Sequence, residues 1–530
     1  MSQGTESDSR ATPEDMLRRI LRARVYDVAI ETPLDPAPGL SLRLNNRVLL
    51  KREDLQPVFS FKLRGAYNRM VGLSRAERSR GVIAASAGNH AQGVALAAQR
   101  LECRAVIVMP LTTPDVKVRA VSSRGAEVIL HGDNYDEACG EAVRIGIEQG
   151  LTFIHPFDDP DVIAGQGTIG IEILRQCSRQ PDAIYVAVGG GGLIAGIGSY
   201  VKAIWPGVEI IGVEPQDADA MTRSLACGER VRLEQVGLFA DGVAVRQVGR
   251  QTFALAQQVV DRMVTVDTDA ICAAIKDVFE DTRSILEPAG ALAVAGMKLD
   301  VQRRGHRNRS LVAVACGANM NFGRLRFVAE RTEIGEDREA MLAVEIPEQA
   351  GSLRRFCTLL GNRNLTEFSY RLADTCRAHI FVGVQTSGTI DEADLIHDVR
   401  AAGFPCLDLS NNELAKLHLR HMVGGRMPAG SGQAAPIQEL LYRFEFPERP
   451  GALMRFLTSL HPGWNISIFH YRNHGADVGR IVVGVQVPPA ELPQWRNFIH
   501  GLGYHFVDET DNPAYRVFLG PCSAPLPSLG

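Results

Sequence analysis

The sequence predicts an α/β protein with doubly wound parallel sheets, followed by two small α+β modules. First, apolar runs of strand type alternate with helical segments from residue 82 to about residue 320, which is typical of parallel sheets covered by helices on both faces. Second, the chain of 530 residues is 45% hydrophobic but only 6% aromatic, as expected for cores of Val, Ile, Leu and Ala. Third, an internal repeat begins after residue 335.

The elements expected along the chain follow from these patterns. Thr12 is expected to cap a helix that begins at Pro13, because threonine accepts a backbone hydrogen bond at a helix start and proline suits the first helical position. In doubly wound folds ligands bind outside the carboxyl ends of the strands, so function is expected in the loops that follow strands. The expected strands are 47–51, 82–85, 105–109, 126–130, 183–188, 208–213 and 311–315, and the expected helices include 91–100, 136–148 and 194–201.

Composition and charge exclude several classes of function. A net charge of −4 does not indicate the basic surface that binds nucleic acid or an anionic membrane. No apolar run reaches the roughly 20 residues that cross a bilayer. The ten cysteines have no C-x-x-C spacing, so neither a structural zinc nor a redox dithiol is expected. We expect reduced thiols in a soluble, cytoplasmic protein. We expect His418 and His421 to be solvated rather than to bind a metal.

The segment Ser60–Ala66 contains the lysine around which the functional hypothesis is built. A lysine is usually a solvated surface charge, but Lys62 lies among apolar residues, after Phe61 and before Leu63. Such surroundings remove hydration from an ammonium group, which lowers its pKa and makes the neutral amine accessible near neutral pH. A neutral, buried amine is what bond formation with an aldehyde cofactor requires.

Two loops that follow expected strands are suited to binding anions. Ser86–Gly93 opens a helix with small residues, which leaves backbone N–H groups exposed at the positive helix end; considered alone, it also fits an ordinary turn. Gly189–Gly192 is a run of four glycines, which is costly to order unless the backbone wraps closely around a phosphate. It lacks the Gly-Lys-Ser/Thr of nucleotide triphosphate loops and the G-x-G-x-x-G of dinucleotide sites; a flexible turn is the alternative.

Cys316 directly follows the expected strand 311–315. A free cysteine is usually a small core residue. At the carboxyl end of a strand, however, its weak S–H donor can face a ring nitrogen.

The repeat after residue 335 indicates two copies of one small module. Each copy is expected to run strand, turn, helix, strand, strand over about 80 residues. A Gly-rich linker, 424–432, separates the copies. Three segments recur in the same order at offsets of 100 and 101: 344–353 with 444–453, 364–371 with 465–472, and 382–385 with 483–486.

Taken together, these motifs resemble the biosynthetic threonine ammonia-lyase (threonine dehydratase) family of enzymes that use pyridoxal 5'-phosphate. The resemblance covers about Thr32 to Leu519. It implies a tryptophan synthase β-like catalytic domain of fold type II over residues 1–335. It also implies ACT-like regulatory modules over 340–422 and 437–520. The motifs that carry it are Ser60–Gly65, Ser86–Gly93, Gly189–Gly192, Gly212–Pro215, Glu287-Pro288 and Cys316–Asn319.

The resemblance also implies a role for each candidate site residue. Lys62 would hold the cofactor covalently, Phe61 would pack near it, and Asn89 would bind its ring hydroxyl. Cys316, at a position that is often serine in relatives, would face the ring nitrogen. The phosphate would lie on Gly189, Gly190, Gly191, Gly192 and Leu193, the substrate on Ser86, Ala87, Gly88 and His90, and effectors near Tyr370 and Tyr471.

The implied activity is β-elimination on L-threonine, which yields 2-oxobutanoate and ammonia in the first step of isoleucine biosynthesis. Isoleucine would inhibit the enzyme, valine is a further candidate effector, and relatives suggest a homotetramer. A serine dehydratase, a serine racemase or a β-replacing synthase shares the site chemistry, but these usually lack the double regulatory tail. A catalytically inactive amino-acid sensor is a further alternative, which the intact Lys62 disfavours.

Overall fold

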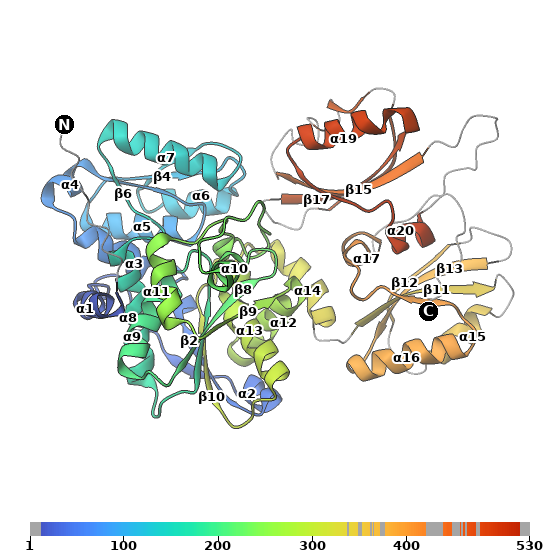
Figure 1. The fold of residues 1–530 in the computed structure, drawn as a ribbon, viewed down its shortest axis with the longest axis horizontal. Helices are drawn as coiled ribbons and strands as arrows, with labels where there is room; N and C mark the ends of the chain where they lie inside the picture. Colours follow the sequence, from blue (N-terminus) through green and yellow to red (C-terminus); the bar gives the residue numbers. More distant parts are fainter. Residues whose placement is uncertain are drawn as a thin grey trace. The chain divides into compact units, whose positions relative to one another are not determined.

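The computed structural model describes residues 12–335, 339–347, 352–360, 363, 365–371, 377–419, 438–447, 456, 459–461, 464–472 and 478–519. The chain divides into two compact units, Met1–Val328 and Ala329–Gly530. Figure 1 draws the first unit from blue to yellow-green and the second from yellow to red. Among the described residues, no helix combines the length and the apolar character needed to cross a membrane.

The first unit contains a six-stranded sheet, which we call the large-lobe sheet. Its spatial order is β1-β2-β10-β7-β8-β9, and every neighbouring pair is parallel except β1 with β2. All residues of β7 and β10 are buried, as expected for central strands with helices on both faces. The strands are β1 (Leu34–Pro36), β2 (Arg47–Arg52), β7 (Ala183–Ala187), β8 (Glu209–Pro215), β9 (Arg262–Val266) and β10 (Ser310–Ala315).

A second, four-stranded parallel sheet forms the small lobe of the same unit. Its order is β5 (Glu127–Leu130), β4 (Ala105–Met109), β3 (Val82–Ala85) and β6 (Thr152–Phe153). Residues of β3 alternate between two apolar cores, with Val82 and Ala84 in one and Ile83 and Ala85 in the other, because successive side chains of a strand point to opposite faces. Apart from the antiparallel edge strand β1, both sheets are parallel, and the predicted α/β class is confirmed.

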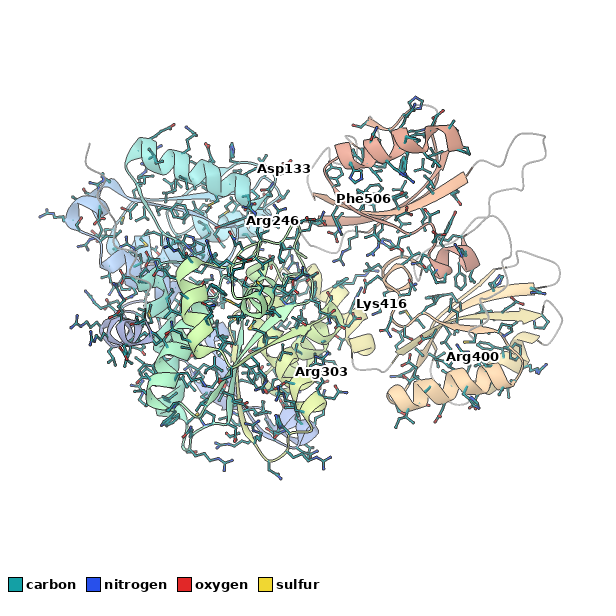
Figure 2. All side chains as sticks on the ribbon, viewed as in Figure 1. Asp133, Arg246, Arg303, Arg400, Lys416 and Phe506 are labelled. Atoms are coloured by element: carbon teal, nitrogen blue, oxygen red, sulfur yellow. The ribbon has the colours of Figure 1, made fainter. Side chains whose placement is uncertain are left out.

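The helices that the sequence predicts in the first unit, from residues 13, 91, 136 and 194, are present, and each begins within about two residues of its expected start. The hydroxyl of Thr12 accepts a hydrogen bond from Asp15 N at 3.2 Å, which caps the first helix. Figure 2 shows the side chains on these elements, with the exposed Arg303 near the end of α13. The helices are α1 (Pro13–Arg22), α2 (Pro38–Leu44), α3 (Lys62–Val71), α4 (Arg75–Arg80), α5 (Asn89–Leu101), α6 (Asp115–Ser122), α7 (Tyr135–Gln149), α8 (Pro160–Gln176), α9 (Gly192–Ile204), α10 (Ala220–Cys227), α11 (Arg250–Val259), α12 (Thr268–Thr282), α13 (Pro288–Arg304) and α14 (Arg324–Gly335), with 3-10 turns η1 (Glu53–Leu55) and η2 (Asp241–Val243).

The second unit contains two four-stranded antiparallel sheets of the same order, β12-β13-β11-β14 and β16-β17-β15-β18. The predicted repeat is therefore present. Each copy also has a short last strand and two helices, one before that strand and one after it, that the sequence did not predict. The elements are β11 (Glu339–Pro347), α15 (Ser352–Leu359), β12 (Leu365–Arg371), β13 (Arg377–Gln385), α16 (Thr389–Ala401), β14 (Cys406–Asp408), α17 (Glu413–Leu417), β15 (Gln438–Pro447), β16 (Asn465–Arg472), β17 (Val478–Val487), η4 (Pro489–Glu491), α19 (Leu492–Gly501), β18 (His505–Asp508) and α20 (Pro513–Phe518).

The two copies share an apolar core within the second unit. Met341 and Phe381 of the first copy lie in one buried cluster with Leu441 and Val482 of the second. The expectation that His418 is solvated is wrong, because its side chain is buried, whereas His421 and the 424–432 linker lie outside the described residues. No group of three metal-ligating side chains occurs among the residues that are described.

A buried cluster of charges lies next to the start of α3. Arg64 Nε contacts Glu53 Oε2 at 2.8 Å and its Nη1 contacts Glu172 Oε1 at 2.7 Å, while Lys51 Nζ contacts Glu172 Oε2 at 2.6 Å. All four side chains have 0% exposure. Although burial opposes it, the charges of Arg64 and Lys51 lower the pKa of the Glu172 carboxyl. The cluster ties β2, η1, α3 and α8 together two residues beyond Lys62.

Replacing Arg64 with leucine is expected to destabilise the first unit. The change leaves two buried carboxylates without their main cation, a loss that costs about 3–5 kcal/mol of unfolding free energy. Urea unfolding followed by circular dichroism measures it as a lower midpoint. Arg144→Leu is the control, because the Arg144 pairs with Glu141 and Glu148 on α7 lie at the surface. Equal midpoints for both variants would contradict the role given to the buried cluster.

Candidate active site

Lys62 lies at the carboxyl end of a central strand of the large-lobe sheet. It is the first residue of α3, and the segment before it pairs with the segment after β10. Phe61 N donates to Cys316 O at 3.2 Å, and Ala318 N donates to Phe59 O at 2.8 Å. The lysine therefore stands at the strand ends, where doubly wound folds bind ligands.

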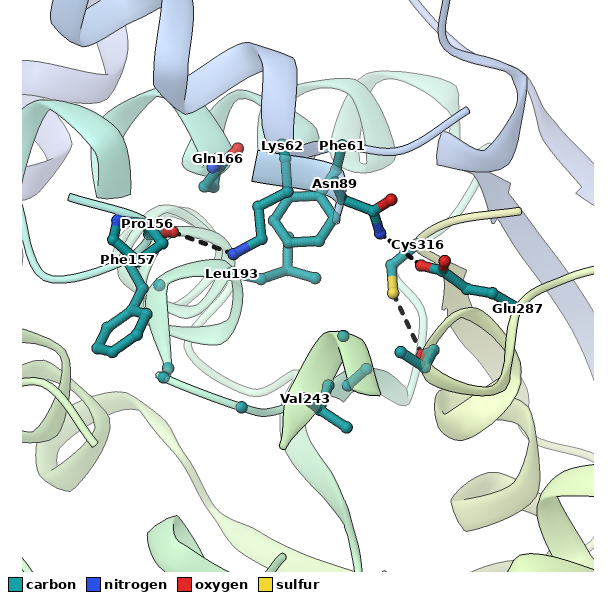
Figure 3. Close-up of a pocket in the computed structure, with 17 residues that line it drawn as sticks. Phe61, Lys62, Asn89, Pro156, Phe157, Gln166, Leu193, Val243, Glu287 and Cys316 are labelled. Atoms are coloured by element: carbon teal, nitrogen blue, oxygen red, sulfur yellow. Dashed lines mark hydrogen bonds between the residues drawn. The ribbon is translucent and has the colours of Figure 1, made fainter. Parts of the chain in front are cut away.

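A cavity brings the separate candidate residues together (Figure 3). It holds roughly 500 Å³ of space not filled by protein, its opening to solvent included. Lys62, Asn89 and Cys316, which are far apart in the sequence, all line it. The lining residues are Phe61, Lys62, Asn89, Pro156, Phe157, Gln166, Ala187, Gly189, Gly190, Gly191, Gly192, Leu193, Gly242, Val243, Glu287, Ala289 and Cys316.

The amine of Lys62 is held in a poorly hydrated place. Its Nζ donates to Pro156 O at 3.0 Å and lies 5.4 Å from the centre of the Phe61 ring. Burial lowers the pKa of the Lys62 amine to about 8, although the neighbouring Cys316 and Glu287 oppose the shift. A substantial fraction of the amine is therefore neutral near physiological pH.

The four-glycine turn forms a cradle at the start of α9, after β7. A Cβ on Gly190 would lie 2.1 Å from the Phe157 ring, and one on Gly189 would lie 2.8 Å from Val243 Cα, so no larger residue fits. Gly191 has a φ of 93°, which only glycine adopts readily. Because the first N–H groups of a helix have no partner within it, this cradle suits a phosphate group.

Asn89 is oriented by hydrogen bonds on both sides of its amide. Its Oδ1 accepts from Asn319 Nδ2 at 2.7 Å, and its Nδ2 donates to Glu287 Oε1 at 2.5 Å. Because an amide nitrogen carries two hydrogens, one is left to face a ligand oxygen in the cavity.

Glu287 is a cavity residue to which sequence analysis assigned no role. It precedes α13, whose first residue is Pro288, and its side chain does not cap that helix. Burial, together with the charge of Asp241, raises the pKa of the Glu287 carboxyl to about 7. The Glu-Pro pair was noted as a motif, but a glutamate before a helix proline is also an ordinary helix start. Its place in the site is seen only in the structure, where it lines the cavity and accepts a hydrogen bond from Asn89.

Cys316 lines the cavity as a protonated thiol. Burial raises the pKa of the Cys316 thiol far above its usual range. Its Sγ donates to Ala289 O at 3.3 Å (Figure 3). Donation to a ring nitrogen would require this hydrogen to leave Ala289 O, so the expected role remains a prediction.

The residues expected to bind substrate flank Asn89, which lines the cavity: Ser86, Ala87 and Gly88 lie between β3 and α5, and His90 is the second residue of α5. Ser86 Oγ accepts from Gly88 N at 3.2 Å, and a Cβ on Gly88 would meet open space. The His90 ring does not line the cavity, since its Nε2 lies 2.9 Å from Ile154 O. Burial lowers the pKa of His90 to about 3, so this side chain is neutral. The His90 ring is therefore no longer a candidate substrate contact. Its backbone N–H remains one, as do Ser86, Ala87 and Gly88.

The two candidate effector tyrosines occupy equivalent strand positions in the second unit. Tyr370 in β12 lies opposite Ile380 of β13, and Tyr471 in β16 lies opposite Ile481 of β17. Their side chains lie outside what the structure describes, so the effector role remains a prediction.

The cavity residues fit pyridoxal phosphate as a group. Lys62 supplies an amine for the aldehyde, the glycine cradle supplies a place for the phosphate, and Asn89 supplies a donor for the ring oxygen. A neutral thiol, Cys316, lines the same cavity.

Comparisons with known proteins agree with this geometry. Residues 25–317 match the family described as pyridoxal-phosphate dependent enzymes, and residues 330–419 and 430–519 match the C-terminal regulatory domain of threonine dehydratase. The chain is 59% identical over 508 residues to "L-threonine dehydratase biosynthetic IlvA" of Burkholderia multivorans, covering 95% of this chain and 99% of that protein. It is 51% identical over 506 residues to the Escherichia coli protein of that name, covering 95% and 97%.

Among solved structures, the processed form of threonine deaminase isoform 2 from Solanum lycopersicum is similar. Its TM-score is 0.60 at 52% sequence identity, and the match covers 63% of this chain and 91% of that chain. Fold and site thus define a pyridoxal-phosphate-dependent enzyme of the tryptophan synthase β-like class, fold type II, followed by ACT-like regulatory modules. The chain belongs to the family of biosynthetic threonine dehydratases.

Replacing Gly190 with alanine is expected to abolish retention of pyridoxal phosphate. The added methyl would overlap the Phe157 ring and spread the cradle that holds the phosphate. Absorbance of the bound cofactor after dialysis measures retention. Gly140→Ala is the control, because a Cβ there meets no atom within 4 Å, and it should retain the cofactor fully. Full retention of the cofactor by the Gly190 variant would contradict the assignment of the four-glycine turn as the phosphate-binding site.

Covalent uptake of pyridoxal phosphate by the cofactor-free protein is expected to depend on pH. With the pKa of Lys62 at about 8, the attacking neutral amine increases roughly tenfold per pH unit below that value. The rate should therefore rise to about pH 8 and level off above it. Rapid-mixing absorbance measures this rate. A rise that continues to about pH 10.4, the pKa of an ordinary lysine, would show that the amine is not perturbed.

Proposed function

We propose that the protein is a threonine ammonia-lyase, which converts L-threonine to 2-oxobutanoate and ammonia. The observation that carries the proposal is the Lys62 amine, which lines the same cavity as the four-glycine cradle and has a lowered pKa. The high identity to curated threonine dehydratases over nearly the whole chain supports the choice of substrate. The reaction is the first step of isoleucine biosynthesis.

Each site residue would bind a different part of the cofactor. Lys62 would hold pyridoxal phosphate covalently, with Phe61 packed beside it. Asn89 would donate to its ring oxygen, in an orientation supported by the contacts with Asn319 and Glu287. The phosphate would lie on Gly189, Gly190, Gly191, Gly192 and Leu193, at the start of α9.

The chain's own groups would carry out the remaining chemistry. When bound, pyridoxal phosphate withdraws electrons from the Cα–H bond of an attached amino acid. The substrate carboxylate would rest on the backbone between Ser86 and Gly88, at the positive end of α5. Lys62 Nζ, neutral and close by, would remove the Cα proton. Cys316, a neutral donor, places no negative charge at the ring, which favours loss of the β-hydroxyl over transamination.

The second unit would regulate this reaction. Two ACT-like modules would bind isoleucine as an inhibitor, and valine as a further effector, near Tyr370 and Tyr471. Inhibition requires isoleucine to bind two global states of the enzyme unequally. We further propose a homotetramer, which the family resemblance implies.

The same proposal includes the domain boundaries and the compartment. The catalytic domain would span 1–335 and the modules 340–422 and 437–520, in keeping with the ranges that match the two families. We place the enzyme in the cytoplasm, because cysteines such as Cys103, Cys227 and Cys316 remain thiols.

An assay of keto-acid formation tests the proposed activity. L-threonine should be turned over in preference to L-serine, and Lys62→Ala should lower kcat by at least about 10³-fold, because nucleophile and base are removed together. Lys202→Ala, which changes a lysine paired with Asp261 elsewhere in the unit, should retain activity. Activity in the Lys62 variant, or a preference for serine, would overturn the assignment.

The same assay tests regulation through the threonine saturation curve. Isoleucine should shift the curve to higher threonine concentration, and Tyr370→Ala or Tyr471→Ala should weaken that shift. An unchanged curve would exclude the regulatory part of the proposal and leave the catalytic part standing.

A further inference from the structure

One wall of the cavity is a short segment, Phe239–Val243, that belongs to the large lobe. Gly242 and Val243 line the cavity directly. A Cβ on Gly189 would lie 2.8 Å from Val243 Cα, and a Cβ on Gly242 would lie 3.7 Å from Glu287 Oε1. The segment therefore touches both the phosphate cradle and the glutamate that orients Asn89. Any displacement of the segment would disturb both parts of the site.

Asp241, in the middle of this segment, is held by two cations. Arg324 Nη1 contacts Asp241 Oδ1 at 3.2 Å and also donates to Phe239 O at 3.2 Å. Lys117 Nζ contacts Asp241 Oδ2 at 2.7 Å. Although burial opposes it, these two charges lower the pKa of the Asp241 carboxyl well below its usual range. The carboxylate is thus charged at all physiological pH values.

The two cations come from different parts of the first unit. Arg324 begins α14, and Phe327 of the same helix packs against Phe239 of the segment, with 5.2 Å between ring centres and the rings tilted by 51°. Lys117 lies on α6, which packs into the small-lobe core through Val121. The Lys117–Asp241 pair therefore joins the small lobe to a cavity wall of the large lobe. Its side chains are only 15% and 25% exposed, so water screens the pair less than it screens a surface pair.

We propose that Lys117 is a positioning residue for the reaction, which fastens the segment Phe239–Val243 against the cavity through its ion pair with Asp241. The segment that it fastens contacts the glycine cradle and Glu287. Lys117 acts by holding the wall that contacts them, and it does so only while the two lobes lie together. The effect on turnover rests on the proposed ammonia-lyase activity, whereas the effect on the segment does not.

Lys117→Met is the test, since it keeps the length of the side chain and removes the charge. Amide hydrogen exchange of residues 239–243, measured in the cofactor-free protein, should become about tenfold faster, because a local opening is no longer opposed by the pair. In the loaded enzyme, kcat/KM for threonine should fall about tenfold or more, since small misplacements of a site wall are costly. Pyridoxal phosphate should also be lost faster on dialysis.

Three further variants separate positioning from general damage. Lys117→Arg should restore slow exchange and kcat/KM. Lys117→Met combined with Asp241→Asn should be less damaging than the product of the two single effects, because both changes break the same Lys117–Asp241 contact. Lys202→Met is the matched control: its Nζ also lies 2.7 Å from a carboxylate, Asp261 Oδ2, with side chains 20% and 36% exposed, and it should change neither exchange at 239–243 nor kcat/KM.

Each outcome decides the proposal. Unchanged exchange at residues 239–243 in Lys117→Met overturns it, whatever the activity. Faster amide exchange at residues 239–243 with a kcat/KM within twofold of the parent value also overturns the proposal. The position of the segment Phe239–Val243 would then have no effect on the reaction. If the parent enzyme does not turn over threonine, the proposed function fails. Exchange and cofactor retention then still support or overturn the positioning role.

Discussion

The amine of Lys62 must be kept from water and yet remain within reach of a ligand, and the first unit is arranged around that double requirement. The lysine begins α3, and glycines let neighbouring helices approach it closely. A Cβ on Gly93 of α5 would lie 3.0 Å from Leu63 N, and one on Gly65 would lie 2.6 Å from Val162 O of α8. Two residues beyond Lys62, the buried Arg64 is paired with Glu53 and Glu172. Close packing and paired charges thus hold the amine in place without hydrating it.

The rest of the cavity complements that amine electrostatically. The glycine cradle and the first turn of α9 offer N–H groups and a positive helix end to an anion. The acidic groups nearby are each partnered: Glu287 accepts from Asn89, and Asp241 lies between Lys117 and Arg324. In a poorly hydrated site an unpaired charge would be costly, so these partners keep the cavity open to a negatively charged ligand.

The parallel strands could be predicted from sequence because burial on both faces makes them continuous apolar runs, as in Ala105–Met109. The same rule fails where burial is partial or the strand is short. β6 has only two residues, and three of the five residues of β9 are half-buried. In the second unit β14 has three residues, too few for a periodic pattern. Pairing with neighbouring strands, rather than local composition, makes these segments strands.

Local sequence determined the groups whose chemistry can be recognised from adjacent residues: an apolar context around Lys62, a run of glycines at 189–192, and a helix start within Ser86–Gly93. It also determined the doubly wound class and the repeat, since periodicity and duplication are properties of the chain itself. Only the tertiary structure decided that Glu287, Phe157 and Val243 share the cavity with Lys62, and that the His90 ring faces Ile154 instead. These placements depend on which loops meet at the strand ends. Such long-range packing leaves no local pattern in the sequence.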